Sequence, residues 1–182
     1  MLAHRLRSDE GAALGDVFTF MSGLYFRGKL AYARRFAQSD ACDSGAHGVL
    51  IITPGIGLLH PDTPVTRARV LQFATTSVDA ENDAFTRPLV QAASRLRDTI
   101  ADDAEVVLLG SVASPKYVSP LLEVFGGRLL FPREFVGRGD MSRGGLLLRQ
   151  VDAEEELEYV PVGGTVRRGA RPARLPPLLR RF

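Results

Sequence analysis

Apolar and polar positions follow a helical spacing in three parts of the chain. The range 24–38 has apolar residues on one face and arginines on the other, which predicts an amphipathic helix. The range 86–101 repeats an apolar residue at i, i+4, i+7 and i+11, with Thr86 as its cap and Pro88 in its first turn. A shorter helix is expected over 116–125.

Between these helices lie short, continuous apolar runs bounded by glycine, proline and acidic residues, a pattern typical of buried strands. The expected strands are 16–20, 49–52, 105–109, 128–131, 146–151 and 157–160. The last two are joined by the acidic turn 152–155, which leaves no room for a helix and predicts a C-terminal β-hairpin. The alternation predicts a three-layer α/β fold, with a mostly parallel sheet and helices on both faces.

The chain of 182 residues has the length of one domain. We expect a frayed lead over 1–15, a single α/β domain over 16–162 and a basic, Arg/Pro-rich tail over 163–182. The tail is expected to be extended, because prolines separate its arginines and it contains no acid. Polar and irregular connections are expected over 40–48 and 56–78.

Composition narrows the class of protein. Hydrophobic residues make up 45% and charged residues 24% of the chain, as in an ordinary globular protein. No run approaches the ~20 apolar residues of a membrane span, and the N-terminus lacks the apolar core of a signal peptide. Cys42 is the single cysteine and the three histidines are scattered. These features predict a cytoplasmic protein with no metal or cofactor and no membrane contact, and they leave the oligomeric state open.

Three of the expected strands lead into loops rich in glycine, serine or arginine. These loops are 53–57, 110–114 and 137–145. In open α/β sheets, ligands bind beyond the carboxyl ends of the strands. If the strands are parallel, the three loops converge on one rim.

The loop at Gly110 and Ser111 joins a strand to a helix start, which offers backbone N–H groups to an anion. Ser111 and Ser114 add hydroxyl groups and Lys116 adds a positive charge. The alternative is a plain turn in which Ser114 caps the helix and Pro115 takes the first helical position. The spacing differs from that of a P-loop.

The segment 137–145 combines glycines with charges. Arg138 and Arg143 are suited to grip a phosphate or carboxylate, and Asp140 to orient an arginine, accept a ribose hydroxyl or act as a general base. The alternative is a tight loop with a structural Asp–Arg pair. The catalytic candidates are therefore Asp140, Lys116 and Ser111. The candidate ligand-binding residues are Gly110, Ser114, Arg138, Ser142, Arg143, Thr53 and Gly55.

The two lysines stand out in this chain. Of its 23 basic residues only Lys29 and Lys116 are lysines, so arginine is the default base here. Lysine is a compact charge with a tunable pKa, which arginine cannot imitate. Tyr25, Lys29 and Tyr32 share one helix face, so Lys29 either reaches a ligand or, as we favour, lays its stem beside core aromatic residues.

Several short segments also carry a resemblance to a known family. They are Leu24-Tyr25-Phe26 with Lys29 and Tyr32, the run 49–59 with Pro61-Asp62-Thr63, and Gly110-Ser111 with Lys116-Tyr117 and Leu121-Leu122. They resemble a family of largely uncharacterised prokaryotic and phage α/β domains with "LY…F", "SAKYGLL-P-D" and "G-x-x-Y" segments. The resemblance covers about residues 20–145, although 53–56 lack the family's lysine and aromatic residue. It implies an α/β fold in the neighbourhood of peroxide stress and nucleic-acid modification.

Two functions follow as expectations. The first is an enzyme that acts on a nucleotide, nucleoside or nucleic-acid base, with N-glycosidic bond chemistry at the carboxylate of Asp140. The second is a non-catalytic module that binds nucleic acid or a partner protein through the same rim and the basic tail. Both expect a phosphate-containing ligand, and the residues alone leave the choice open.

Overall fold

The computed structural model describes residues 2–37 and 48–176. The helices of these ranges are α1 (Leu2–Arg5), α2 (Leu14–Phe36), α3 (Arg67–Thr75), α4 (Asp83–Arg97), α5 (Pro115–Phe125) and α6 (Asp140–Ala153), with 3₁₀ turns at Gly126–Arg128 and Arg133–Phe135. The strands are β1 (Ala12–Ala13), β2 (Ile51–Thr53), β3 (Gly57–Leu59), β4 (Pro64–Val65), β5 (Val106–Val107), β6 (Leu129–Pro132) and β7 (Tyr159–Pro161).

The expected three-layer, mostly parallel sheet is wrong. The strands of the described residues are short and fall into separate sheets of two, two and three strands. β1 pairs with β4 and β2 with β3, both antiparallel, while β5 is parallel and β7 antiparallel to β6. The expectation failed because β2 turns straight back into β3 as a hairpin, so it never feeds a helix as a parallel strand would.

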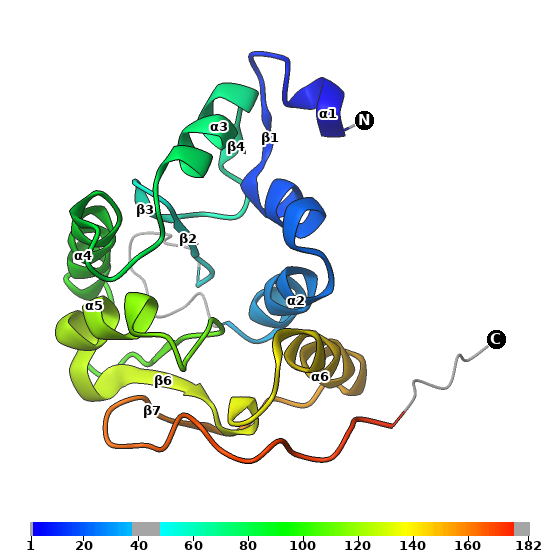
Figure 1. The fold of residues 1–182 in the computed structure, drawn as a ribbon, viewed down its shortest axis with the longest axis vertical. Helices are drawn as coiled ribbons and strands as arrows, with labels where there is room; N and C mark the ends of the chain where they lie inside the picture. The colour runs from blue at the N-terminus through cyan, green and yellow to red at the C-terminus, as the bar shows by residue number, and fades with distance from the viewer. Residues whose placement is uncertain (1, 38–47, 177–182) are drawn as a thin grey trace.

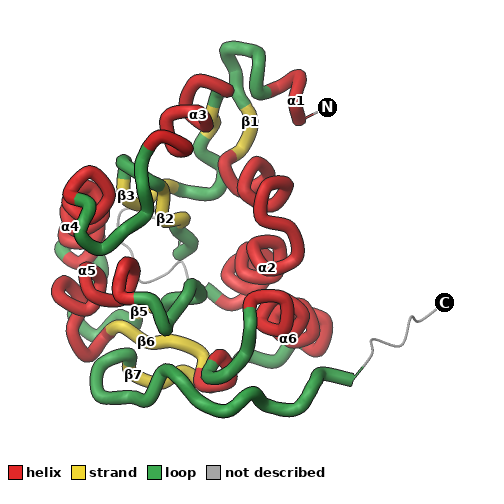
Figure 2. The backbone as a smooth tube through the Cα atoms, viewed as in Figure 1, coloured by secondary structure: helices red, strands yellow, loops and turns green. Residues whose placement is uncertain are grey.

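The helices surround these small sheets rather than layering over a large one. Figure 1 shows α4 and α5 on one side of the molecule and α2 and α6 on the other, with β6 and β7 between them at the lower edge. Figure 2 shows how little of the backbone is strand. The main hydrophobic core joins α4, α5, α6 and β6 through buried residues that include Phe85, Phe125, Phe131 and Leu147.

α2 links this core to a second, smaller one. Its first half contributes Leu14 and Val17, which pack with Phe73 of α3. The helix bends at Gly23, whose φ of 61° lies in the left-handed region that favours glycine. The expected strand 16–20 is therefore wrong: it lies within α2, where Leu14 and Val17 are buried and Phe20 is exposed.

The C-terminal β-hairpin is also wrong. Residues 146–151 lie within α6, and β7 pairs with β6 instead. The expected loop 137–145 is a turn only as far as Gly139, because Asp140 begins α6. Gly144 serves packing rather than loop geometry: a Cβ there would lie 2.8 Å from the Cα of Tyr25 on α2.

Elements nearer the middle of the chain agree better with expectation. α5 begins at Pro115 after Ser114, as the plain-turn alternative predicted, and the pairing of β5 with β6 is parallel. α4 begins earlier than expected, because Asn82, not Thr86, is its cap. The Asn82 side chain accepts a hydrogen bond from the Ala84 N–H at 3.1 Å.

The two ends of the described chain both lie against the body. In the expected lead 1–15, β1 pairs with β4, and Ala12 is fully buried. Residues 163–176 run extended along the body, and Arg149 of α6 donates a hydrogen bond to the Pro176 carbonyl. Most of the expected loop 40–48, with Cys42, lies outside the described residues. No helix in the described ranges has the length and apolarity to cross a membrane.

Candidate functional site

A cavity of about 800 Å³ lies between the second half of α2, the β2–β3 hairpin, β5 and the starts of α5 and α6. This volume falls in the range of small-molecule binding pockets, roughly 300–1,000 Å³. Aliphatic side chains of β2, β3, β5 and α5 form its apolar wall, among them Ile52, Leu58 and Leu121. Its polar and charged lining residues are Tyr25, Lys29, Glu105, Ser111, Ser114, Lys116, Tyr117 and Asp140.

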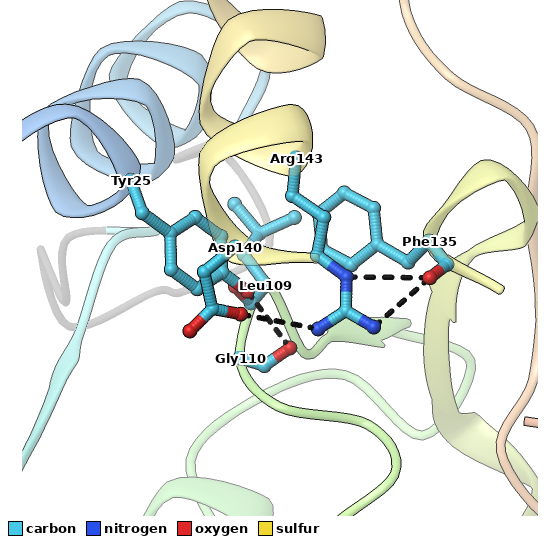
Figure 3. Close-up of polar contacts among 6 residues, drawn as sticks. All are labelled: Tyr25, Leu109, Gly110, Phe135, Asp140 and Arg143. Atoms are coloured by element: carbon cyan, nitrogen blue, oxygen red, sulfur yellow. Dashed lines mark hydrogen bonds and ion pairs between the residues drawn. The ribbon is translucent and has the colours of Figure 1, made fainter. Parts of the chain in front are cut away.

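Tyr25 fixes the loop that follows β5. Its hydroxyl donates to the carbonyl oxygens of Leu109 (3.2 Å) and Gly110 (3.1 Å), as Figure 3 shows. Burial raises the pKa of Tyr25 to about 12, although the charge of Arg143 acts in the opposite direction. The phenol therefore stays protonated at neutral pH and holds the Gly110 loop against α2.

Lys29 lies one turn further along α2 and on the same face. Its Nζ is 4.4 Å from the centre of the Tyr25 ring and 5.2 Å from that of Phe26. Burial lowers the pKa of Lys29, and the positive charge of Arg143 adds to this, while Asp140 opposes it. Among the described residues, no hydrogen bond or ion pair engages its amine. At a given pH, a larger fraction of Lys29 is therefore neutral than of an ordinary lysine.

The first turn of α6 carries Asp140, which lines the cavity, and Arg143, which pairs with it. Arg143 is buried, and its Nε and Nη2 donate to the Phe135 carbonyl at 3.2 and 2.9 Å. Its Nη1 lies 3.6 Å from Oδ1 of Asp140, whose carboxylate is exposed (Figure 3). Arg143 thus anchors the start of α6 and leaves only one edge toward Asp140.

The start of α5 supplies the remaining polar groups. The N–H groups of a helix's first turn have no partner within the helix and carry partial positive charge. Ser111 and Ser114 precede that turn, and Lys116 lies within it. Burial, followed by the charge of Asp140, raises the pKa of Tyr117, which also lines the cavity. This end of the cavity is suited to an anion.

The structure brings two of the three expected loops to this one cavity. Gly110, Ser111, Ser114, Lys116 and Asp140 line it together. The third loop does not take part, because it is the turn of the β2–β3 hairpin. There Thr53 is buried and donates from Oγ1 to the Gly57 carbonyl at 2.9 Å, and Gly55 packs against Thr76.

Arg138 and Ser142 also lie outside the cavity lining. Nη1 of Arg138 donates to Oγ of Ser142 at 3.2 Å, one helical turn away. Arg143 is committed to the Phe135 carbonyl, so the pair of arginines does not form the expected phosphate clamp. Of the charged residues in 137–145, Asp140 is the one that lines the cavity.

Sequence reasoning did not include Lys29, Tyr25 and Tyr117 among the site residues. The signal was the scarcity of lysine: both lysines of the chain line this cavity. The helix face shared by Tyr25, Lys29 and Tyr32 is visible in the sequence, but the favoured interpretation placed the Lys29 stem beside core aromatic residues. Tyr32 does belong to the core, where it accepts a hydrogen bond from the Leu157 N–H at 2.8 Å. Within the described ranges, no group of three His, Cys, Asp or Glu residues is placed to hold a metal ion.

Comparisons with family models, with curated proteins and with solved structures found no match to this chain. The cavity itself combines an apolar wall with two lysines, two carboxylates and a helix N-terminus.

Proposed function

We propose that the cavity binds a nucleotide or a related phosphorylated nucleoside, and that the protein is an enzyme acting on its N-glycosidic bond. One observation carries the proposal: the only two lysines among 23 basic residues line a single cavity with an apolar wall. In a chain that otherwise uses arginine, both lysines thus lie where a small ligand would bind, and Lys116 is the one at the helix N-terminus that suits an anion. The apolar wall suits a base, and the α5 start suits a phosphate.

Asp140 is one of two carboxylates that line the cavity, with Glu105, and we assign it the role of acting on such a ligand. It belongs to the cavity lining, and its partner Arg143 holds it at 3.6 Å without enclosing it. A carboxylate beside a sugar either stabilises positive charge that develops at the anomeric carbon or activates a water molecule for attack there. The phosphate end and the carboxylate end of the cavity come from different helices, so a ligand that reaches both is oriented.

The binding half of the proposal is tested at Lys116. Isothermal titration of the full chain with AMP, GMP, CMP and UMP is expected to show binding of at least one of them. Lys116→Gln should weaken it by about tenfold or more, since a charge-assisted hydrogen bond contributes about 1.5–3 kcal/mol. The matched control is Arg87→Gln on α4, which removes an exposed charge paired with Asp83 and should bind as the wild type does. Equal loss in both variants, or no binding by any of the four nucleotides, would contradict the proposal.

The catalytic half is tested at Asp140. Chromatography is expected to show release of free base from the nucleotide that binds, and Asp140→Asn should slow it by about 100-fold or more, as for loss of a general acid–base group. Binding should remain, because the phosphate end of the cavity is untouched. Binding by the wild type without any base release would instead favour the non-catalytic module.

A further inference from the structure

We propose that Lys29 is a nucleophilic amine that forms an imine with the carbonyl carbon of a phosphorylated aldehyde or ketone held in this cavity. The inference rests on the proposed function in one respect, which is that the α5 end of the cavity holds the phosphate. It goes further by naming the reactive group and the substrate class, a sugar phosphate in its open-chain form.

The position of Lys29 separates it from a lysine that only attracts anions. It arises from the middle of α2, and its Nζ lies over the Tyr25 and Phe26 rings at 4.4 and 5.2 Å. Lys116 lies in the first turn of α5, next to the serines of the preceding loop, and its Nζ is 5.2 Å from the centre of the Tyr117 ring. The two amines differ in their place in the cavity: Lys116 lies at the helix N-terminus that suits the phosphate, and Lys29 lies on α2, beside the rest of the ligand.

Burial shifts Lys29 toward the neutral amine, which is the reactive form. Burial lowers its pKa, and the groups that face it set the balance: Arg143 of α6 lowers the pKa further, and Asp140 raises it. The phenols of Tyr25 and Tyr117 have raised pKa values and remain neutral, so they add no charge near neutral pH. Among the described residues the amine has no hydrogen bond to give up before it attacks.

The reaction balances with the groups of the cavity alone. The lone pair of Lys29 Nζ forms a bond to the carbonyl carbon, the carbonyl π bond breaks, and Asp140 moves one of the two amine protons from the nitrogen to the oxygen to give a carbinolamine. Asp140 then accepts the second proton from the nitrogen and delivers it to the hydroxyl group, the carbon–oxygen bond breaks, and the oxygen leaves as water. The product is the imine, one water molecule is released, and nothing is oxidised or reduced.

The test uses pyridoxal 5′-phosphate, which carries an aldehyde and a phosphate on one ring. The full chain is incubated with it, reduced with borohydride and mapped by mass spectrometry after trypsin digestion. The amines are the N-terminus, Lys29 and Lys116, and trypsin places them in separate peptides because Arg27, Arg34, Arg97 and Arg128 flank the lysines. Labelling is expected at Lys29.

Matched variants and probes distinguish an imine site from random labelling. Lys29→Arg keeps the charge but cannot form an imine, so it should lose the label while its circular dichroism stays that of the wild type. Lys116→Gln should keep the label on Lys29 but require about tenfold more reagent, which reports the phosphate contact. Pyridoxal without the phosphate should show the same weakening on the wild type. Labelling should rise with pH to a midpoint below the ordinary lysine value.

The outcomes separate the inference from the function on which it rests. Labelling that falls mainly on Lys116 or the N-terminus, or none at Lys29, overturns the inference even if AMP or another nucleotide binds. If Lys29 is labelled, and nucleotides neither bind the protein nor block the labelling, the result supports the nucleophilic role of Lys29 and counts against the proposed nucleotide function. Labelling of Lys29 that a bound nucleotide blocks supports both.

Discussion

Gly144→Ala is expected to lower the free energy of unfolding by about 2 kcal/mol, because overpacking of a close contact typically costs 1–3 kcal/mol. The new Cβ would lie 2.8 Å from the Cα of Tyr25 and 2.9 Å from the Leu24 carbonyl oxygen. Both are backbone atoms of α2, so neither can rotate away as a side chain would. The reciprocal contact is equally tight, since a Cβ on Gly28 would lie 2.6 Å from the Gly144 carbonyl oxygen.

The adjacent glycine provides the control. A Cβ at Gly145 would meet its nearest atom, Cδ1 of Leu175, at 3.8 Å, which is ordinary contact. Gly145→Ala should therefore stabilise the protein by up to about 1 kcal/mol, the difference in helix propensity between alanine and glycine. Urea denaturation of the two variants measures the difference. If both changed stability by the same amount, the close crossing of α2 and α6 would not be what Gly144 provides.

The crossing also matters for the candidate site. α2 carries Tyr25 and Lys29, while α6 carries Asp140, so a change in the spacing of the two helices would move these cavity-lining side chains relative to one another. Gly144→Ala is expected to weaken ligand binding as well as stability, whereas Gly145→Ala should leave binding unchanged. The close contact of Gly28 with Gly144 thus connects the packing of α2 and α6 to the spacing of the charged side chains on them.

These glycines explain why the C-terminal third was predicted poorly. A sequence pattern with Gly144 and Gly145 is typical of a loop, since glycine weakens a helix by about 1 kcal/mol relative to alanine. Here the close approach of α2 requires it, and this long-range fact cannot be read from the residues alone. The pattern predicts a loop over 137–145 and a strand over 146–151, whereas the chain is helical from Asp140 to Ala153.

Local signals were reliable where they acted through neighbouring residues. Ser114 and Pro115 begin α5 because proline needs no hydrogen-bonding partner in the first turn, and that is visible in sequence. The residues that line the cavity divide in the same way. Gly110, Ser111 and Lys116 follow from the strand–turn–helix pattern, whereas Lys29 enters only because α2 packs against α6 and the β5–α5 loop. The prediction for Thr53 assumed that β2 is a parallel strand whose end opens onto the site. β2 pairs antiparallel with β3 instead, and Thr53 is not among the cavity-lining residues.

Arg143→Met is expected to lower the free energy of unfolding by about 2–3 kcal/mol, the typical cost of hydrogen bonds from a charged group to a buried acceptor. The guanidinium donates twice to the Phe135 carbonyl, at 3.2 and 2.9 Å, and methionine leaves that oxygen without these donors. The ion pair with the exposed Asp140 adds little to this, because solvent screens it. Arg143→Lys keeps the charge but replaces a two-pronged donor, so it should lose part of the same stability.

The second consequence of Arg143→Met falls on Lys29. The positive charge of Arg143 lowers the pKa of that amine, so its removal should raise the pKa toward the ordinary lysine value. At a given pH a smaller fraction of Lys29 is then neutral, and the midpoint of labelling by pyridoxal 5′-phosphate should move to higher pH. Arg143→Lys keeps the positive charge and should leave most of the midpoint in place.

Arg138→Met is the matched control for this shift. Arg138 lies in the turn before α6 and bonds to Ser142, outside the cavity lining, and it has no part in the pKa of Lys29. Its loss should leave the labelling midpoint unchanged. An equal shift in Arg138→Met and Arg143→Met would mean that net charge, rather than the position of Arg143, controls the amine. An unchanged labelling midpoint in Arg143→Met would contradict the proposed effect of Arg143 on the pKa of Lys29. The buried arginine of α6 would then contribute to stability alone.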